Sequence, residues 1–514
     1  MGDGPSDTVA LVTEDVLDVS TQRFRENPSL DETVSQTYET NNSHLPKQDS
    51  AESSGTLGIP EMRVYKRRWY ILILFSLMAC HQCAIWNTWG PIASSVQSAY
   101  GWSDGTVAMM ANWGNFMFVL TAVPLSWMVE RKGVRPTVLL VSGLIMVGSV
   151  LRCCRYIISD PQVFLAASHI CAIFDGIAGV TIMAAPPLIS SLWFPINERT
   201  TATSINQAGN MLGNGLSMLI GPALVMLNDT NTNDTSFLNF YETFGIQSTV
   251  LPSNRDKEDI KDDIDDYMII DAGAAAAIFF LIAAYFPSKP PLAPTLTSVI
   301  VRTDFTNGLK KLVCDKDILL TCFAYSLSQG IMGSWMGVMV FNLRPLGISD
   351  QEIGYIGLGS VLGQCFASML AGYLSDWLRK RIKICLIILL TVSGAIFVLL
   401  TFMCLQVIST SYPVLFFVIV SATSLNFACC PLFFELSVEI AYPVSESLIG
   451  GFLTTIYNLV GIVFLFLFFI PNIGSIWINY VLVGSVVLSI PAVILVKERY
   501  NRSSVDELVN GIEE

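Results

Sequence analysis

Long apolar stretches separated by short polar segments make up most of this chain. A membrane-spanning helix needs about 20 mostly apolar residues, and the sequence offers twelve such stretches. They cover residues 69–95, 106–129, 135–156, 163–188, 200–227, 267–286, 317–342, 352–375, 383–405, 412–434, 446–470 and 475–496. The pattern therefore predicts an all-α membrane protein with twelve transmembrane helices.

Lysine and arginine residues beside the helix ends predict the orientation, because positively charged loops stay in the cytoplasm. The loops on the side of the N-terminus carry 20 of these residues, and the opposite loops carry 6. Both termini are therefore expected in the cytoplasm. The segment 228–266 then faces the lumen or the exterior, where the sequons at Asn228 and Asn233 predict N-glycosylation.

The two ends of the chain are polar. Residues 1–62 are rich in Ser, Thr, Asp and Glu and lack the apolar core of a signal peptide, so they predict a disordered, acidic cytoplasmic tail. Residues 497–514 predict a second, shorter cytoplasmic tail. The formal charge of −13 falls mainly on residues 1–62 and 228–266, which carry −9 and −7. The remaining body lacks a strongly basic surface, which excludes nucleic acid and leaves the lipid bilayer as its surroundings.

Catalytic and metal-binding motifs do not emerge from the sequence. Most of the 12 cysteines lie inside apolar stretches, and their spacing fits neither a disulfide framework nor a zinc site. No Walker lysine motif is present, and no hydrolase or metalloprotease motif stands in a suitable context. We therefore expect no cofactor, no metal and no enzyme activity. A secondary transporter and a non-transporting receptor or sensor of the same fold both remain open.

The twelve stretches divide into two sets of six. The first occupies residues 63–286, the second occupies 317–496, and a cytoplasmic linker at 287–316 joins them. Internal repeats of this kind are common in transporters. The sequence thus predicts two six-helix bundles.

A similar charge pattern follows the second helix of each set. The first copy reads PLSWMVERKGVR and contains Glu130 and Arg131, and the second reads GYLSDWLRKR and contains Asp376 and Arg379. Such clusters can form ion pairs that hold one face closed and break as the other opens. Charges that only obey the positive-inside rule would look the same.

These loops and two further motifs resemble known transporters. The two copies resemble the loop motif of the major facilitator superfamily, although Pro124 and Glu130 replace a Gly and an Asp of that motif. The sequences WFPINERTTAT at 193–203 and FELSVEIAYPVSE at 434–446 resemble the feline leukaemia virus subgroup C receptor family. WNTWGPI at 86–92 and AYFPSKPPL after residue 283 most resemble its lysosomal branch.

The resemblance implies a major facilitator fold and proton-linked movement of a small organic solute. In the lysosomal branch the solute is pyridoxine, and in the plasma-membrane branch it is choline, ethanolamine or a haem-related compound. The expected location is the lysosomal membrane, with the plasma membrane as the alternative. An incomplete acidic dileucine sorting signal at residues 7–12 adds little support for the lysosomal location. We expect a monomer.

Polar and aromatic side chains inside apolar helices are costly unless they face a cavity or a partner, so they are the substrate-site candidates. They are Trp86, Asn87, Tyr325, Gln329, Trp335, Asn426 and Asn458. Aromatic faces bind a cation or stack on a flat ring, and amides bind hydroxyl groups. The resemblance aligns Met211 and Asn458 with two glutamines of the choline carriers, which favours a neutral hydroxylated ring over choline.

Proton coupling needs a group that titrates between cytosolic and lysosomal pH. Burial raises the pKa of a carboxyl group, and histidine already titrates in this range. The candidates are His81, His169, Asp175, Glu435 and Glu439. Each could instead have an ordinary hydrogen-bonding role. The two glutamates could equally form an ion-pair gate with basic loop residues such as Arg199.

Overall fold

The computed structural model describes residues 62–225, 257–295, 303–348, 350–378, 381–408, 411–467 and 476–505. These residues are mainly helical and include no strand. The glycosylation sites predicted at Asn228 and Asn233, the gating residue Arg379 and nearly all of the tail predicted at 1–62 lie outside them.

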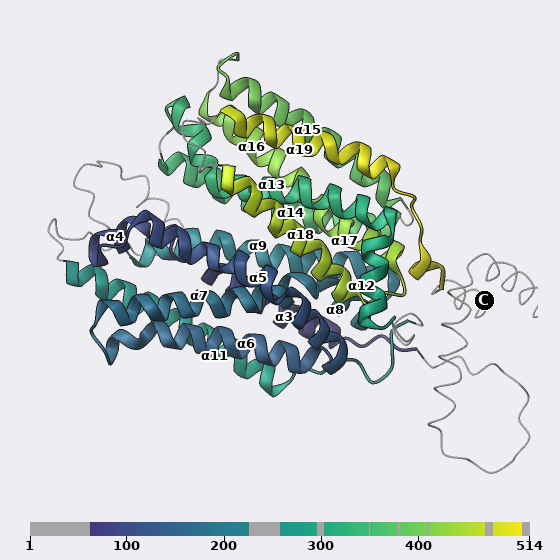
Figure 1. The fold of residues 1–514 in the computed structure, drawn as a ribbon, viewed down its shortest axis with the longest axis horizontal. Helices are drawn as coiled ribbons and strands as arrows, with labels where there is room; N and C mark the ends of the chain where they lie inside the picture. Colours follow the sequence, from purple (N-terminus) through teal and green to yellow (C-terminus); the bar gives the residue numbers. More distant parts are fainter. Residues whose placement is uncertain are drawn as a thin grey trace, which may run out of the picture.

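The helices form two bundles that lie side by side (Figure 1). The N-terminal half contains α3 (Arg68–Trp86), α4 (Ala93–Tyr100), α5 (Asp104–Lys132), α6 (Val134–Arg152), α7 (Pro161–Ala184), α8 (Pro186–Trp193), α9 (Arg199–Leu224) and α11 (Lys257–Ala284). The linker helix α12 (Phe305–Cys314) precedes the C-terminal half, which contains α13 (Lys316–Leu343), α14 (Asp350–Leu378), α15 (Ile382–Cys404), α16 (Tyr412–Phe427), α17 (Cys429–Ala441), α18 (Glu446–Phe466) and α19 (Ile476–Leu495).

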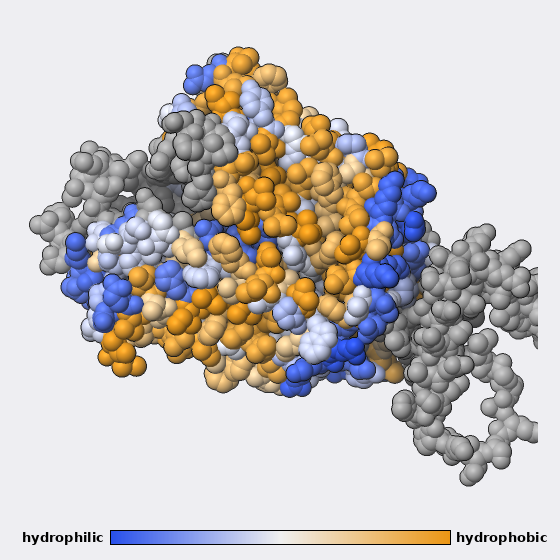
Figure 2. All heavy atoms as spheres, viewed as in Figure 1, coloured by the Kyte–Doolittle hydropathy of each residue, from blue (hydrophilic) through white to orange (hydrophobic). Residues whose placement is uncertain are grey.

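The prediction of twelve transmembrane helices in two six-helix bundles is confirmed. Ten of the described helical segments are long and apolar enough to cross a membrane, and α9 and α13 complete the twelve. Figure 2 shows apolar side chains over the middle of the bundle and polar ones gathered near its two ends. We call the end where α3 begins and α5 ends the basic end, because the loops rich in Lys and Arg lie there.

Local sequence explains several helix boundaries. The Ser103 side chain accepts a hydrogen bond from the backbone N–H of Thr106 at 3.2 Å and so caps α5. Asp160 caps α7 in the same way, and Pro161 occupies its first turn. Gly133 has φ +87° between α5 and α6, a conformation that glycine adopts without strain.

Several predicted boundaries were wrong. The stretch 69–95 is not one helix, because α3 ends at Trp86 and the separate α4 follows. The stretches 163–188 and 412–434 each lie in a broken span, α7 with α8 and α16 with α17. Proline explains these breaks, because Pro186 and Pro431 lack the N–H that would continue the helical hydrogen bonding. Helix α11 begins at Lys257, inside the predicted loop 228–266, and a helix, α12, lies in the predicted linker.

The two halves are in close contact at the basic end. Gly450 on α18 lies so near α7 that an added Cβ atom would come within 2.2 Å of the Ala184 carbonyl oxygen. On the same helix, an added Cβ at Gly451 would come within 2.5 Å of Ser126 Oγ on α5. Glycine is required at Gly450 because the backbones of α18 and α7 approach each other directly, and at Gly451 because the Ser126 side chain occupies the space of a Cβ atom.

Candidate functional site

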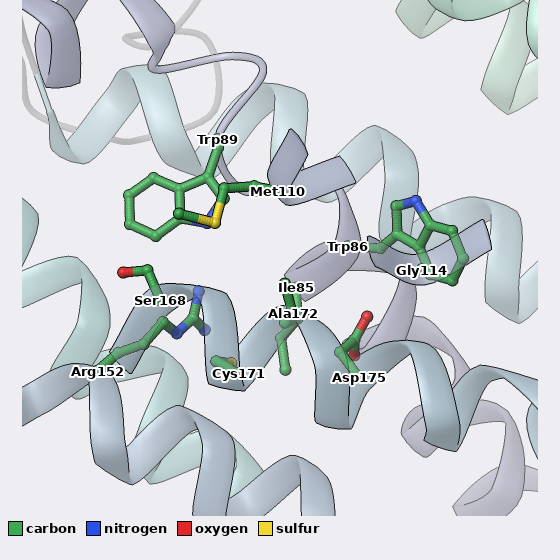
Figure 3. Close-up of a pocket in the computed structure, with 10 residues that line it drawn as sticks. All are labelled: Ile85, Trp86, Trp89, Met110, Gly114, Arg152, Ser168, Cys171, Ala172 and Asp175. Carbon is green, nitrogen blue, oxygen red and sulfur yellow. The ribbon is translucent and has the colours of Figure 1, made fainter. Parts of the chain in front are cut away.

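A small pocket lies in the N-terminal half, beside the end of α3. Its free space, counting the part open to solvent, is about 270 Å³. Residues from α3, α5, α6 and α7 and the segment after α3 line it (Figure 3). They are Ile85, Trp86, Trp89, Met110, Gly114, Arg152, Ser168, Cys171, Ala172 and Asp175. We refer to this cavity as the Trp86 pocket.

Trp86 owes its position to two glycines on neighbouring helices. A Cβ atom added to Gly114 on α5 would lie 2.1 Å from Trp86 Cζ2, and one added to Gly179 on α7 would lie 3.3 Å from Trp86 Cζ3. The indole ring therefore packs against bare backbone, where any larger residue would displace it. The structure thus places Trp86 in a pocket, as the substrate-site prediction requires, and the two glycines were not foreseen.

A buried ion pair forms one wall of the pocket. Arg152 at the end of α6 is 1% exposed and bonds to the Asp271 carboxylate on α11. Its guanidinium carbon lies 5.9 Å from the centre of the Trp89 ring, and Figure 3 shows the side chain extending toward that ring. Arg152 is the last residue of α6, so it lies at a helix end as its sequence position suggests, but its side chain is buried in the bundle. Asp271 was not singled out from the sequence.

His81 completes this group of charges. Its Nε2 atom lies 3.0 Å from Asp271 Oδ1, so the carboxylate lies between the imidazole on α3 and Arg152 on α6. A single carboxylate therefore connects three helices of the N-terminal half.

Asp175 on α7 lies at the Trp86 end of the pocket (Figure 3) and is 2% exposed. Gln82 Nε2 on α3 donates to its Oδ2 atom at 3.0 Å and approaches its backbone oxygen at 3.4 Å. The other carboxylate oxygen, Oδ1, has no hydrogen-bond partner among the described residues. Gln82 was not singled out from the sequence, although a glutamine inside an apolar helix was a usable signal.

Two other predicted residues have local partners. Trp113 Nε1 on α5 donates to His169 Nδ1 at 3.0 Å, so His169 accepts through one ring nitrogen. Asn87 Nδ2 donates to the Cys83 carbonyl at 2.9 Å and thereby caps the end of its own helix. Neither contact excludes a further role, and neither residue lines the Trp86 pocket.

The C-terminal half brings amides and aromatic rings together. Gln329 Nε2 on α13 donates at 2.9 Å to both the backbone and the side-chain oxygen of Asn426 on α16. Gln329 Oε1 and Asn426 Nδ2 are buried and have no hydrogen-bond partner among the described residues. The Tyr325 ring lies 5.9 Å from the ring of Tyr457 on α18.

Two predicted substrate residues lie apart from this cluster. Trp335 is fully buried and packs edge-on against Phe397 of α15, with ring centres 6.4 Å apart. Asn458 Nδ2 donates to the Thr454 carbonyl of its own helix at 2.8 Å. The structure therefore brings Tyr325, Gln329 and Asn426 together but does not join Trp335 to them.

At the basic end, Asp376 of α14 connects the halves. Its carboxylate accepts from the backbone N–H groups of Thr200 at 3.1 Å and Thr201 at 2.7 Å, and from the Thr201 hydroxyl at 2.7 Å. It therefore caps the start of α9, where the positive end of the helix dipole favours a carboxylate. The sequence predicted an ion pair here, and the observed contact is a helix cap.

The first copy of the loop motif makes a different contact. Arg131 bonds to Asp304, just before α12, at 2.9 Å, and both side chains are about half exposed. Glu130 Oε2 is buried without a hydrogen-bond partner among the described residues. The two copies, similar in sequence, thus have unlike surroundings.

Glu435 and Glu439 on α17 bind the segment after α19. Arg502, which is fully buried, bonds to Glu435 and lies 3.4 Å from Glu439 Oε1. Ser503 donates to Glu439 through its backbone N–H at 3.0 Å and its hydroxyl at 2.6 Å. The first part of the cytoplasmic tail predicted at 497–514 is therefore held against α17 by buried charges.

The expected pairing of these glutamates with Arg199 stays a prediction. Arg199 is fully buried and donates to the Thr295 hydroxyl at 2.6 Å. It also interacts electrostatically with Glu435.

Sequence comparison agrees with this architecture. The Major Facilitator Superfamily model matches residues 74–248. A solute carrier family 49 member 4 homolog from Xenopus tropicalis is 32% identical over 465 residues, which cover 87% of this chain and 95% of that protein. The choline/ethanolamine transporter FLVCR2 of Rattus norvegicus is 26% identical over 419 residues, which cover 78% of this chain and 69% of that protein.

Solved structures show the same fold. The transporter FucP in its outward conformation superposes with a TM-score of 0.60 at 12% identity and covers 84% of this chain and 100% of its own. The proton:xylose symporter XylE superposes with a TM-score of 0.54 at 12% identity and covers 85% of this chain and 99% of its own. At this identity the likeness establishes the fold alone.

Proposed function

Because the chain belongs to solute carrier family 49 of the major facilitator superfamily, we propose that it exports pyridoxine from lysosomes together with protons, by alternating access. Membrane transport of a small solute follows from the family. The identity of the solute, the coupling to protons and the lysosomal location are the parts that we propose. Pyridoxine is a flat aromatic ring that carries several hydroxyl groups.

One observation supports the choice of pyridoxine as the solute. The buried amides Gln329 and Asn426 leave one acceptor and one donor without partners. A buried polar group without a partner costs about 1–3 kcal/mol, and a hydroxyl group can satisfy both of these atoms because it donates and accepts. The indole of Trp86 supplies an aromatic face in the other half. A ring with hydroxyl groups matches this combination.

Choline or ethanolamine is the second candidate. Asp175 offers a buried carboxylate oxygen beside Trp86, an arrangement that suits an organic cation, and relatives are named choline/ethanolamine transporters. Met211, by contrast, packs against the apolar core of the C-terminal half. Asn458 is engaged by its own helix. These two positions favour a neutral solute.

The test is uptake of labelled pyridoxine and choline by vesicles containing the purified full chain, with inside-acid and inside-alkaline gradients. We expect pyridoxine uptake that depends on the gradient. Trp86→Ala should abolish it, whereas Trp127→Ala, at a tryptophan that is 45% exposed on α5, should not. Unchanged uptake by Trp86→Ala would remove Trp86 from the site. Absence of any flux of either solute would favour a non-transporting receptor or sensor.

A second pair of variants tests the position of the ring. Gly114→Ala adds a methyl group where Trp86 now lies, whereas Gly273→Ala on α11 meets nothing within 4 Å. We expect reduced uptake only for Gly114→Ala. Equal uptake by both variants would show that the exact position of the ring is unimportant. Imaging of the tagged chain in cells distinguishes lysosomal from plasma-membrane location.

A further inference from the structure

The group of charges around the Trp86 pocket contains more acidic than basic side chains. Arg152 is the one arginine in the group around the pocket, and it faces two carboxylates, Asp271 and Asp175. All three lie within helices that cross the membrane, where an uncompensated charge is strongly unfavourable. The group therefore requires one more positive charge.

The surrounding side chains do not supply it. Among the described residues, the other ionisable groups that interact with these charges are thiols and a phenol, which carry no charge near neutral pH. They are Cys83 on α3, Cys153 after α6, Cys171 on α7 and Tyr267 on α11. Met110 and Gly114 of α5, together with Trp89, add only uncharged surface to the pocket. His81 is the one further group able to take up a proton.

We propose that Asp175 binds the exchangeable proton of this group, with Arg152 and Asp271 as a fixed ion pair beside it; the inference rests on the proton coupling proposed above. Protonation forms an O–H bond at the Asp175 oxygen that has no partner, and release leaves a carboxylate at the Trp86 end of the pocket. Proton binding and solute binding thereby act on the same cavity.

Geometry favours Asp175 over His81. His81 lies 3.0 Å from Asp271, which Arg152 already pairs, so a proton on His81 would join the two groups already in contact and would leave Asp175 without a charged partner beside it. Among the described residues, the Asp175 side chain receives a hydrogen bond from the neutral amide of Gln82 alone. A buried carboxylate with one neutral donor and a free oxygen is stabilised by taking up a proton.

The role of Arg152 follows from the same charge count. As long as Asp271 holds Arg152, Asp175 must bind a proton to stay buried. If Asp271 were neutral, Arg152 would be left with Asp175 as its counter-ion, and the group would be balanced without a proton. Asp271 is therefore a positioning residue for the proton site.

Infrared difference spectroscopy of the purified full chain, shifted between two pH values, tests the inference without any solute. We expect a carboxylic C=O band that disappears in Asp175→Asn. Asp160→Asn makes the same chemical change at the exposed cap of the same helix and should leave the band intact. His81→Gln, which keeps a donor toward Asp271, should also retain it. A band that persists in Asp175→Asn, or one that is lost in His81→Gln, would overturn the assignment.

Asp271→Asn provides a second, independent variant. It leaves Asp175 in place, yet the charge count predicts that the carboxylic band disappears, because Arg152 now balances Asp175. A purely structural Asp271 would leave the band unchanged, which would also overturn the proposal. Since the readout needs no transported solute, a failure of pyridoxine transport is distinguishable from a failure of this assignment.

Discussion

The two halves of the molecule bury their charges in different surroundings. In the N-terminal half, Arg152 and two aspartates surround a pocket within the bundle. In the C-terminal half, Arg502 and two glutamates lie at the basic end, and the interior holds amides and phenols such as Gln329 and Tyr325. The same architecture, used twice, is thus specialised. One half is suited to charge and protons, and the other to uncharged polar groups.

The surroundings also change what the charges can do. Arg152 lines a pocket, whereas Arg502 has no exposed surface and packs against Glu435 and Glu439. The Arg152 group can therefore respond to a proton. The Arg502 group instead fastens the C-terminal segment to α17.

The largest effect is expected from Arg152→Met. The variant leaves Asp271 and Asp175 buried without a permanent counter-charge and should lower the free energy of unfolding by about 3–5 kcal/mol. Thermal unfolding in detergent measures this effect. Asp271→Asn should cost clearly less, because Arg152 can still balance Asp175. Equal losses for the two variants would contradict the idea of a shared arginine.

Arg502→Met should be the next most damaging change. It removes the cation between Glu435 and Glu439, and the expected loss of stability is on the order of 2–3 kcal/mol. This is below the loss for Arg152→Met, because Ser503 still donates two hydrogen bonds to Glu439. Arg499→Met is the matched control in the same segment, since Arg499 is 47% exposed where it pairs with Asp317. If Arg502→Met proved as harmful as Arg152→Met, the Ser503 hydrogen bonds would not compensate for the lost cation.

The amide pair of the C-terminal half should affect transport more than stability. Replacing Gln329 and Asn426 together by leucine removes both partners and is expected to change the free energy of unfolding by less than about 1 kcal/mol, yet to abolish solute uptake. The control is the pair Asn342 and Asn479, which bond to each other at 2.7 Å between α13 and α19. The same double replacement there should preserve uptake. Retained uptake in the Gln329 and Asn426 variant would exclude these amides from the site.

The smallest effect is expected at Arg131. Its contact with Asp304 is about half exposed on both sides, and exposed ion pairs contribute about 0–1 kcal/mol. Arg131→Ala should therefore leave the thermal midpoint nearly unchanged. A large drop would mean that the first copy of the loop motif stabilises the basic end more than its exposure implies.

The sequence by itself determined the twelve spans and the division into two halves. These features depend on local information, because hydrophobic length and the position of charges beside helix ends can be read along the chain. Helix breaks at Pro186 and Pro431 were legible in the same way, although the predicted spans ignored them.

Only the tertiary structure decided which charges are buried and with which partners. Arg152 meets Asp271 across 119 positions of the chain, Gln82 meets Asp175 across 93, and Arg502 meets Glu435 across 67. In sequence, Arg152 and Arg502 look like ordinary basic residues at helix ends. Their burial depends on the packing of whole helices, which places a carboxylate within reach and makes an otherwise prohibitive charge stable inside the bundle.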